Sequence, residues 1–145
     1  MELKIKKLHP DAIMPTYGTD GAACFDLYCL EFVGAHPKDS NANIFETGIA
    51  VEVPPGWCLE INSRSGQGFN DAVRLSNCTG QIDSDYRGSI KISLRWDSDD
   101  EGLWPRYGDR IAQAKLVPSP RLTLVEVDEL SETVRGTGGF GSTGA

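Results

Sequence analysis

Two segments of the chain combine residues that suit phosphate and base chemistry. Residues 62–68, Asn-Ser-Arg-Ser-Gly-Gln-Gly, directly follow an alternating apolar–polar stretch. At the end of such a strand, the guanidinium of Arg64, the hydroxyl of Ser65 and the backbone N–H of Gly66 come together, and an oligophosphate needs donors of this kind. An ordinary turn would use the same residues, so this segment alone leaves both interpretations open.

The second segment, residues 77–88, reads Asn-Cys-Thr-Gly-Gln-Ile-Asp-Ser-Asp-Tyr-Arg-Gly. We expect a hairpin bracketed by Gly80 and Gly88, with Asp83 and Tyr86 near its tip. Its exposed backbone can pair with the edge of a base, the tyrosine ring can pack on a sugar or base, and a nearby aspartate can deprotonate water. The alternative is an acidic turn with a surface tyrosine.

Two further segments leave their interpretation open. In residues 108–116, Gln113 is flanked by apolar residues, so it is either a hydrogen-bonded core amide or a ligand contact. Residues 135–145 contain five glycines. Their Gly-x-Gly-x-x-Gly spacing lacks the strand and helix of a Rossmann site. They form either a disordered tail or an arm that orders over a ligand through Arg135, Phe140 and two hydroxyls.

Short alternating runs separated by Gly- and Pro-containing turns must position these segments, and they predict an all-β fold. Helical periodicity is weak, with at most a turn or two in 67–75 and 127–134. The chain of 145 residues is 39% hydrophobic, which fits a single domain. The expected strands are Leu3–Ile5, Val51–Val53, Leu59–Ile61, Ile90–Leu94 and Leu122–Leu124. The expected turns include Pro54–Gly56, Ser65–Gly68, Tyr107–Asp109 and Pro118–Pro120.

Charge and hydropathy exclude several classes of function. The net charge is −7 and no stretch concentrates Lys or Arg, so binding to a nucleic-acid backbone is not expected. No apolar run approaches the ~20 residues that span a bilayer, and the first residues lack the apolar core of a secretory signal. We therefore expect a soluble, intracellular and cytoplasmic protein without a membrane partner.

Cysteine and histidine usage narrows the chemistry further. Four cysteines could form two disulfides or a metal site, but their spacings do not match the common zinc patterns, so free thiols in a reducing compartment are expected. With two histidines in the chain, a Ser-His-Asp or Cys-His relay has little material. Any acid–base chemistry should therefore rest on a carboxylate.

Taken together, five ordered segments resemble the five motifs of the trimeric dUTPase family: residues 21–27, 63–66, 80–88, 108–113 and 135–144. The resemblance covers nearly the whole chain. It implies a jelly-roll-like all-β subunit of residues 1–134 with an arm at 135–145, and a homotrimer whose active sites are shared between chains. The implied reaction is Mg²⁺-dependent hydrolysis of dUTP to dUMP and pyrophosphate, which lowers dUTP and supplies dUMP for thymidylate synthesis.

The same resemblance implies a role for each matched residue. Asp83 would activate the water that attacks the α-phosphorus, and Tyr86 would pack under deoxyribose and exclude a 2′-hydroxyl. Asp26 would hold Mg²⁺ through water. Base recognition falls to Asn77, Gly80, Gln81 and Ile82, and phosphate binding to Arg64, Ser65, Gly66 and Gln113. Lys91 is a further expected substrate-binding residue. The arm would cover uracil with Phe140 and hold the γ-phosphate with Arg135, Gly141, Ser142 and Thr143.

Two other functions compete with this interpretation. The related dCTP deaminases carry a catalytic Glu on the strand five residues after the hairpin glycine, where this chain has Ser93, so deaminase activity is not expected. A nucleotide-gated binding protein would use loop 34–43 or the acidic loop 97–102 as its contact surface. The catalytic matches argue against a purely non-enzymatic role, although a regulatory partner beside hydrolysis stays open.

Overall fold

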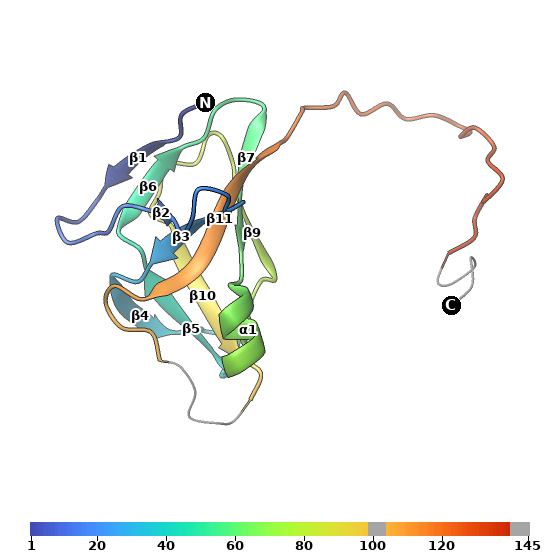
Figure 1. Ribbon diagram of the computed structural model, residues 1–145. Coiled ribbons are helices and arrows are strands. Elements are labelled where there is room, and N and C mark those ends of the chain that lie inside the picture. The colour runs from blue at the N-terminus through green and yellow to red at the C-terminus, as the bar shows by residue number, and fades with distance from the viewer. Residues whose placement is uncertain (99–103, 140–145) are drawn as a thin grey trace.

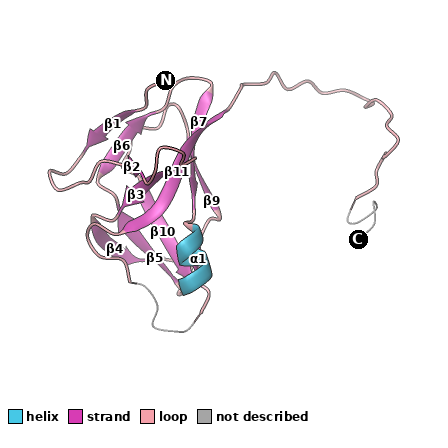
Figure 2. Cartoon of the chain, in the orientation of Figure 1, coloured by secondary structure: helices cyan, strands magenta, loops and turns pink. Residues whose placement is uncertain are grey.

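Alternating side chains produce the strands that the period-two pattern predicts. The computed structural model describes residues 1–98 and 104–139, and this part of the chain contains eleven strands and one short helix (Figure 1, Figure 2). In chain order the elements are β1 (Lys4–Lys7), β2 (Thr16–Tyr17), β3 (Phe25–Tyr28), β4 (Glu31–Ala35), β5 (Ala42–Glu46), β6 (Ile49–Glu52), β7 (Trp57–Asn62), α1 (Ser65–Asp71), β8 (Val73–Leu75), β9 (Thr79–Ile82), β10 (Lys91–Trp96) and β11 (Arg110–Pro118).

The strands pair into three antiparallel sheets, ordered β1-β6, β4-β5-β10-β8 and β2-β3-β11-β7-β9. One side chain in two along each central strand enters a common core, in which Leu27, Phe45, Leu59 and Ile111 are fully buried. Each such side chain contributes roughly 1.5–3 kcal/mol relative to its exposed state. The predicted jelly-roll-like all-β fold is confirmed.

Four of the five predicted strands overlap strands of the structure, namely β1, β6, β7 and β10. The prediction was wrong for Leu122–Leu124, because residues 119–139 form neither helix nor strand and leave the body after β11 (Figure 1). The helical turn expected in 127–134 is also absent, since this range lies within the same irregular segment. Period-two alternation predicts a strand, but a strand also needs a neighbouring edge with which to pair.

The segment after β7 is helical rather than a simple turn. The turn predicted at Ser65–Gly68 is the first part of α1, and the short helix expected within 67–75 begins and ends earlier. Ala72 ends α1 in the left-handed conformation at φ 51°, and its N–H donates to the carbonyl of Gln67. No helix in the described ranges 1–98 and 104–139 has the length and apolar character needed to cross a membrane.

The predicted hairpin between Gly80 and Gly88 was wrong in its pairing, and the difference matters for the site. β9 pairs with β7, whereas β10 pairs with β5 and β8. The two strands therefore belong to different sheets and diverge from the loop that joins them, residues 83–90. Within the described residues β9 is therefore the edge strand of its sheet, and its backbone groups on the side away from β7 have no strand partner, whereas a paired hairpin would have bonded them to β10.

Candidate active site

A buried carboxylate joins two arginines at one end of the largest sheet. The Asp26 side chain lies on β3 and the residue is 8% exposed. Its Oδ1 accepts from Nε of Arg64 at 3.1 Å, and its Oδ2 accepts from the Arg110 guanidinium at 3.2 Å. The register explains the meeting, because Gln113 of β11 lies opposite Asp26 on one side and Asn62, two residues before Arg64, on the other.

Neighbouring amides fix the backbone around these arginines. Gln113 donates from Nε2 to the carbonyl of Ser63 at 2.9 Å, and the buried Gln67 donates to the carbonyl of Arg110 at 3.0 Å. The Arg64 guanidinium also donates to that carbonyl, at 3.3 Å. Gln113 is therefore a hydrogen-bonded amide in this state, and its bond orients the residue just before Arg64.

The arginine cluster, defined as Asp26, Arg64 and Arg110, carries one positive charge in excess. The Arg64 side chain is 24% exposed and that of Arg110 is 49% exposed, so both guanidinium groups still reach solvent. Ser65 and Gly66 follow at the start of α1 and are exposed. The arrangement presents oriented donors, a hydroxyl and glycine backbone at one place, which suits an oligophosphate.

A cavity of about 330 Å³ lies where β9 and β10 diverge. It brings together five of the predicted substrate-binding residues, Asn77, Gly80, Gln81, Ile82 and Lys91. A Cβ added at Gly80 would lie 3.2 Å from the Ile61 side chain of β7, so glycine allows β9 to pack closely against β7 at this point. The cavity is lined further by His36, Ile61, Leu75, Ser76, Ile92 and Ser93.

A buried thiol holds one lining side chain in place. Cys58 of β7 donates from Sγ to Oε1 of Gln81 at 2.7 Å. Burial is the main cause that raises the pKa of Cys58, so its proton stays on sulfur at neutral pH. All four cysteines are free, as the spacing analysis predicted.

The loop 83–90 carries the predicted acid–base and sugar-binding residues, and side-chain hydrogen bonds within the loop and to β5 restrain it. Tyr86 donates from its hydroxyl to the carbonyl of Ser89 at 3.0 Å, while the Ser89 hydroxyl donates to the Glu46 carboxylate on β5. A Cβ at Gly88 would lie 2.4 Å from the Tyr86 hydroxyl oxygen, so glycine leaves the space that the ring occupies. Asp83 is exposed and directly follows the cavity residue Ile82.

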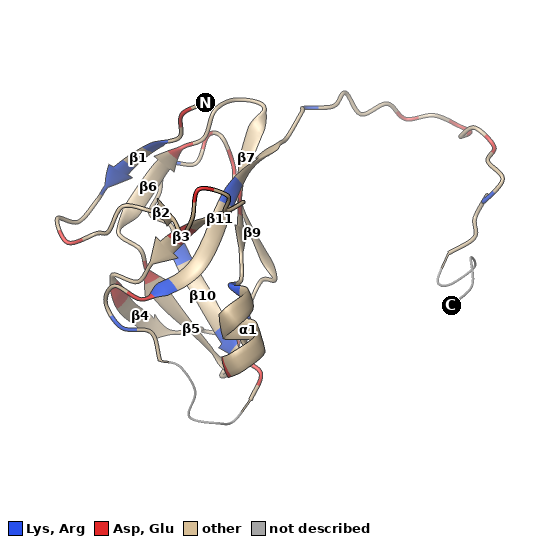
Figure 3. Cartoon of the chain, viewed as in Figure 1, with Lys and Arg blue, Asp and Glu red and all other residues tan. Residues whose placement is uncertain are grey.

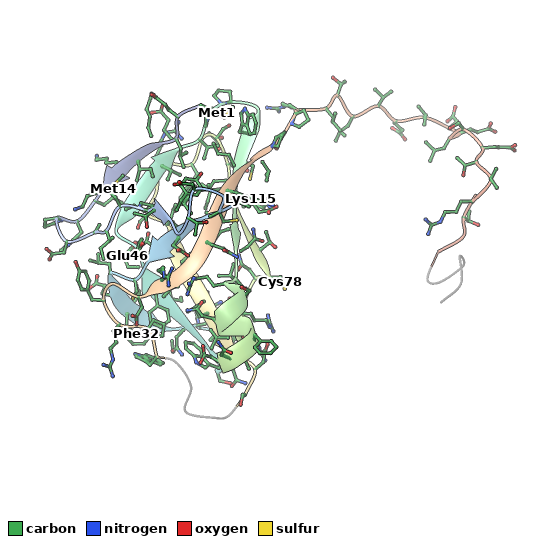
Figure 4. All side chains as sticks on the ribbon, viewed as in Figure 1. Met1, Met14, Phe32, Glu46, Cys78 and Lys115 are labelled. Carbon is green, nitrogen blue, oxygen red and sulfur yellow. The ribbon has the colours of Figure 1, made fainter. Side chains whose placement is uncertain are left out.

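Glu46 connects this loop to the sheet, because its carboxylate also accepts from the backbone N–H groups of Thr47 and Gly48 (Figure 4). Charged positions are otherwise scattered over the body, and the ribbon shows no continuous basic face in this view (Figure 3). Of the described residues, no group of three or more His, Cys, Asp or Glu side chains is arranged to hold a metal ion.

The sequence interpretation missed Arg110 and Gln67 beside Arg64, and six of the residues that line the cavity. Arg110 and Gln67 lie inside segments that the motifs already covered, and the arginine three residues before Gln113 was the available signal. His36 and Ser93 enter the cavity through sheet pairing, which no local pattern shows.

Of the predicted arm residues, the structure describes Arg135, which is not brought to the site within this chain. Arg135 lies on the segment 119–139, which runs away from the body, and its Nε donates to the carbonyl of Gly138 (Figure 1). Phe140, Gly141, Ser142 and Thr143 lie outside the described residues, as does much of the acidic loop.

Comparison with known proteins agrees with this geometry. The family model described as dUTPase matches residues 10–144. The chain is 44% identical over 144 residues to the deoxyuridine 5'-triphosphate nucleotidohydrolase of Nautilia profundicola, covering 99% of both, and 40% identical to that of Helicobacter pylori, covering 99% and 97%. The dUTPase of Staphylococcus bacteriophage 80alpha, solved with dUPNHPP, superimposes with a TM-score of 0.83 at 28% identity and 99% coverage of both chains. This chain belongs to the dUTPase family of hydrolases.

Proposed function

We propose that this enzyme hydrolyses dUTP to dUMP and pyrophosphate, with Asp83 as the general base. The cavity between β9 and β10 carries the proposal. On one side of it lies β9, the edge strand of its sheet, whose backbone groups on the side away from β7 lack a strand partner among the described residues, and β9 leads directly into the loop with Asp83 and Tyr86. Exposed backbone donors and acceptors can read the edge of a pyrimidine, and the following carboxylate is then placed toward the 5′ side of the nucleotide.

In the proposed step the Asp83 carboxylate accepts a proton from water, and the oxygen of that water bonds to the α-phosphorus. The bond from the α-phosphorus to the bridging oxygen breaks, and its electron pair leaves with pyrophosphate. Asp83 is exposed in the single chain, so water can reach its side chain.

The arginine cluster is the proposed phosphate site, together with Ser65, Gly66 and Gln113. Asp26 holds the Arg64 guanidinium before substrate arrives, so less side-chain entropy is lost on binding. Ser65 then stands next to Arg64 to stabilise charge on the leaving oxygen. Gln113 acts here by fixing the Ser63 carbonyl.

Tyr86 is the proposed selector of the sugar. Its ring is restrained by the hydrogen bond to the Ser89 carbonyl and by the space at Gly88. A restrained ring under the deoxyribose leaves no room for a 2′-hydroxyl, which favours dUTP over UTP.

Mg²⁺ enters this proposal with the substrate, as a complex of the triphosphate. The absence of a metal-binding group among residues 1–98 and 104–139 supports a cation held mainly by phosphate oxygens. Asp26 would contact it through water, in addition to its bonds to the two arginines. The ion supplies charge neutralisation on the phosphates.

The working enzyme is proposed to be a homotrimer in which residues 135–145 of one chain cover a site on another. The segment 119–139 supports this, because its large apolar side chains are exposed in the single chain: Leu122, Leu124, Val125, Val127, Leu130 and Val134. Free thiols at all four cysteines support action in a reducing cytoplasm.

Pyrophosphate release tests the proposed function. The full chain is incubated with dUTP, dTTP, dCTP or UTP, each with Mg²⁺ or with EDTA. We expect rapid release from dUTP with Mg²⁺ and much slower release in every other mixture. Equal rates with dUTP and dTTP, or ammonia release from dCTP, would contradict the proposal.

A further inference from the structure

Ser93 carries an unusual hydroxyl at the wall of the base cavity. Its Oγ is inaccessible to solvent and has no hydrogen-bond partner, and it is the one buried side-chain oxygen or nitrogen in this condition within residues 1–98 and 104–139. Buried hydroxyl groups are normally hydrogen-bonded, because an unpaired one loses its bonds to water without replacement. A partner from outside the protein chain would satisfy it.

The strand pairing explains why the protein itself offers no partner. Ser93 of β10 pairs with Ile44 of the neighbouring strand β5, and Ile44 has an apolar side chain. On the other side, the Ser93 carbonyl accepts from the N–H of Ser76 at 2.9 Å, so the backbone is satisfied while the hydroxyl is not. The unsatisfied group is therefore the side chain alone.

The surroundings of Ser93 fit a polar heterocycle. The cavity is also lined by Asn77 and Lys91, whose side chains suit the polar edge of a ring. The volume of about 330 Å³ is far above the ~30 Å³ share of one water molecule, so a ring and an ordered water both fit.

We propose that the Ser93 side chain, whose hydroxyl is buried in the unliganded chain, rotates toward the cavity when a nucleotide binds and donates to a carbonyl oxygen of the pyrimidine, directly or through one ordered water. The proposal rests on the proposed function, since it takes the cavity as the base site. It goes beyond the motif residues, because Ser93 lies on β10 after the loop and was assigned no part in binding. Being neutral and weakly acidic, its hydroxyl orients the base without taking part in the chemical step.

This role predicts that one substitution at Ser93 keeps or raises the stability of the unliganded enzyme and weakens nucleotide binding. In the unliganded enzyme the unpaired hydroxyl is unfavourable, so Ser93→Ala should keep or raise the Tm, by up to about 3 °C. In the complex the same substitution removes a bond to the base. Sites kept for function commonly show this trade between stability and activity.

The experiment compares the full-length enzyme with Ser93→Ala and with the control Ser119→Ala, an exposed serine after β11. Calorimetry measures the Kd for dUMP, inhibition measures the affinity for pyrophosphate, and steady-state assays give kcat and KM for dUTP. For Ser93→Ala we expect the dUMP Kd and the dUTP KM to rise together about 5–10-fold, with kcat within twofold and pyrophosphate affinity unchanged. Ser119→Ala should match the parent throughout.

Unchanged dUMP affinity in Ser93→Ala would overturn the proposal, whether the Tm rose or fell. Equal weakening of dUMP and pyrophosphate would overturn it as well, since that pattern marks a general disturbance of the site. A parent enzyme that released no pyrophosphate from dUTP would instead contradict the proposed function. The two failures are therefore distinguished by the parent's own activity.

Discussion

The body of the subunit is ordered by pairing between its strands, whereas the segment that follows β11 forms no strand or helix up to residue 139. In the body, sheet pairing brings together Asp26 of β3, Gln113 of β11 and Arg64, which follows the end of β7. The segment 119–139 has no such pairing, and its side chains extend away from the body (Figure 4). Its first residue, Ser119, donates from its N–H to the carbonyl of Gly56, and the backbone bonds described farther along are local, such as Gly138 N–H to the carbonyl of Arg135.

This difference teaches which parts of a site a single chain can preorganise. The arginine cluster and the base cavity are formed without substrate, so their ordering cost is met during folding. The segment 119–139 leaves large apolar side chains such as Leu124 and Leu130 exposed in the single chain, so it needs another surface against which to order. We expect a neighbouring chain and the nucleotide to supply it.

The largest effect should come from the exposed carboxylate of the body. Asp83→Asn keeps the shape of the side chain and removes the proton acceptor, so turnover should fall by roughly 10²–10⁴-fold while dUTP binding is retained. Single-turnover assays and calorimetry measure the two. The neighbouring exposed acid provides a matched control, Asp85→Asn, which should stay within twofold of the parent. Retained turnover in Asp83→Asn would remove Asp83 from its role.

Deletion of residues 135–145 tests the other side of the comparison. The body and its trimer should form with an unchanged Tm, while turnover falls by about 100-fold or more, because the substrate is no longer covered. Size-exclusion chromatography, thermal unfolding and pyrophosphate release provide the readouts. A chain that lacks Ala145 alone serves as the control. An unaffected rate after the longer deletion would contradict the role of the arm as a lid.

Asp26→Asn tests preorganisation within the body. The neutral amide loses one charge-assisted bond to each arginine, so we expect the KM for dUTP to rise about 10-fold or more. The control is Glu52→Gln, which breaks the ion pair of a surface carboxylate with Lys4 and leaves the arginine cluster intact, so it should leave KM unchanged. A parent-like KM in Asp26→Asn would show that Arg64 needs no partner to bind phosphate.

A smaller effect is expected at Gly88, where an added methyl group would meet the Tyr86 hydroxyl at 2.4 Å. Displacing the ring should lower the preference for dUTP over UTP about 10-fold, measured as the ratio of kcat/KM values. Gly18→Ala is the matched control, because an added Cβ there has nothing within 4 Å. If Gly88→Ala kept the full preference, the ring would not be the selector of the sugar.

Local pattern predicted much of the body and failed where partners are distant. Leu59–Ile61 and Ile90–Leu94 alternate strongly, and both lie in strands of the structure. Leu122–Leu124 alternates equally well, yet it forms no strand, because pairing depends on an available edge. The same limit misled the hairpin prediction, since β9 and β10 each pair with strands that lie elsewhere in the sequence.

The site was predictable in its motif residues and not in its connections. Arg64, Asp83 and Tyr86 stand in segments whose residue types already suggest phosphate, acid–base and ring contacts. The bonds of Asp26 to two arginines and the entry of Ser93 into the cavity follow from sheet register instead. Register is a long-range property that single-residue patterns do not contain.

One mixing experiment tests most directly whether the body of one chain and the arm of another form a single site. Asp83→Asn chains and chains that lack residues 135–145, both inactive alone, are unfolded together, refolded as mixed trimers and assayed for pyrophosphate release from dUTP. Exchange of arms predicts recovery of about a quarter of parental activity at equal mixing, because a site then combines an intact Asp83 with an intact arm. Activity no higher than that of the separate variants would contradict the account.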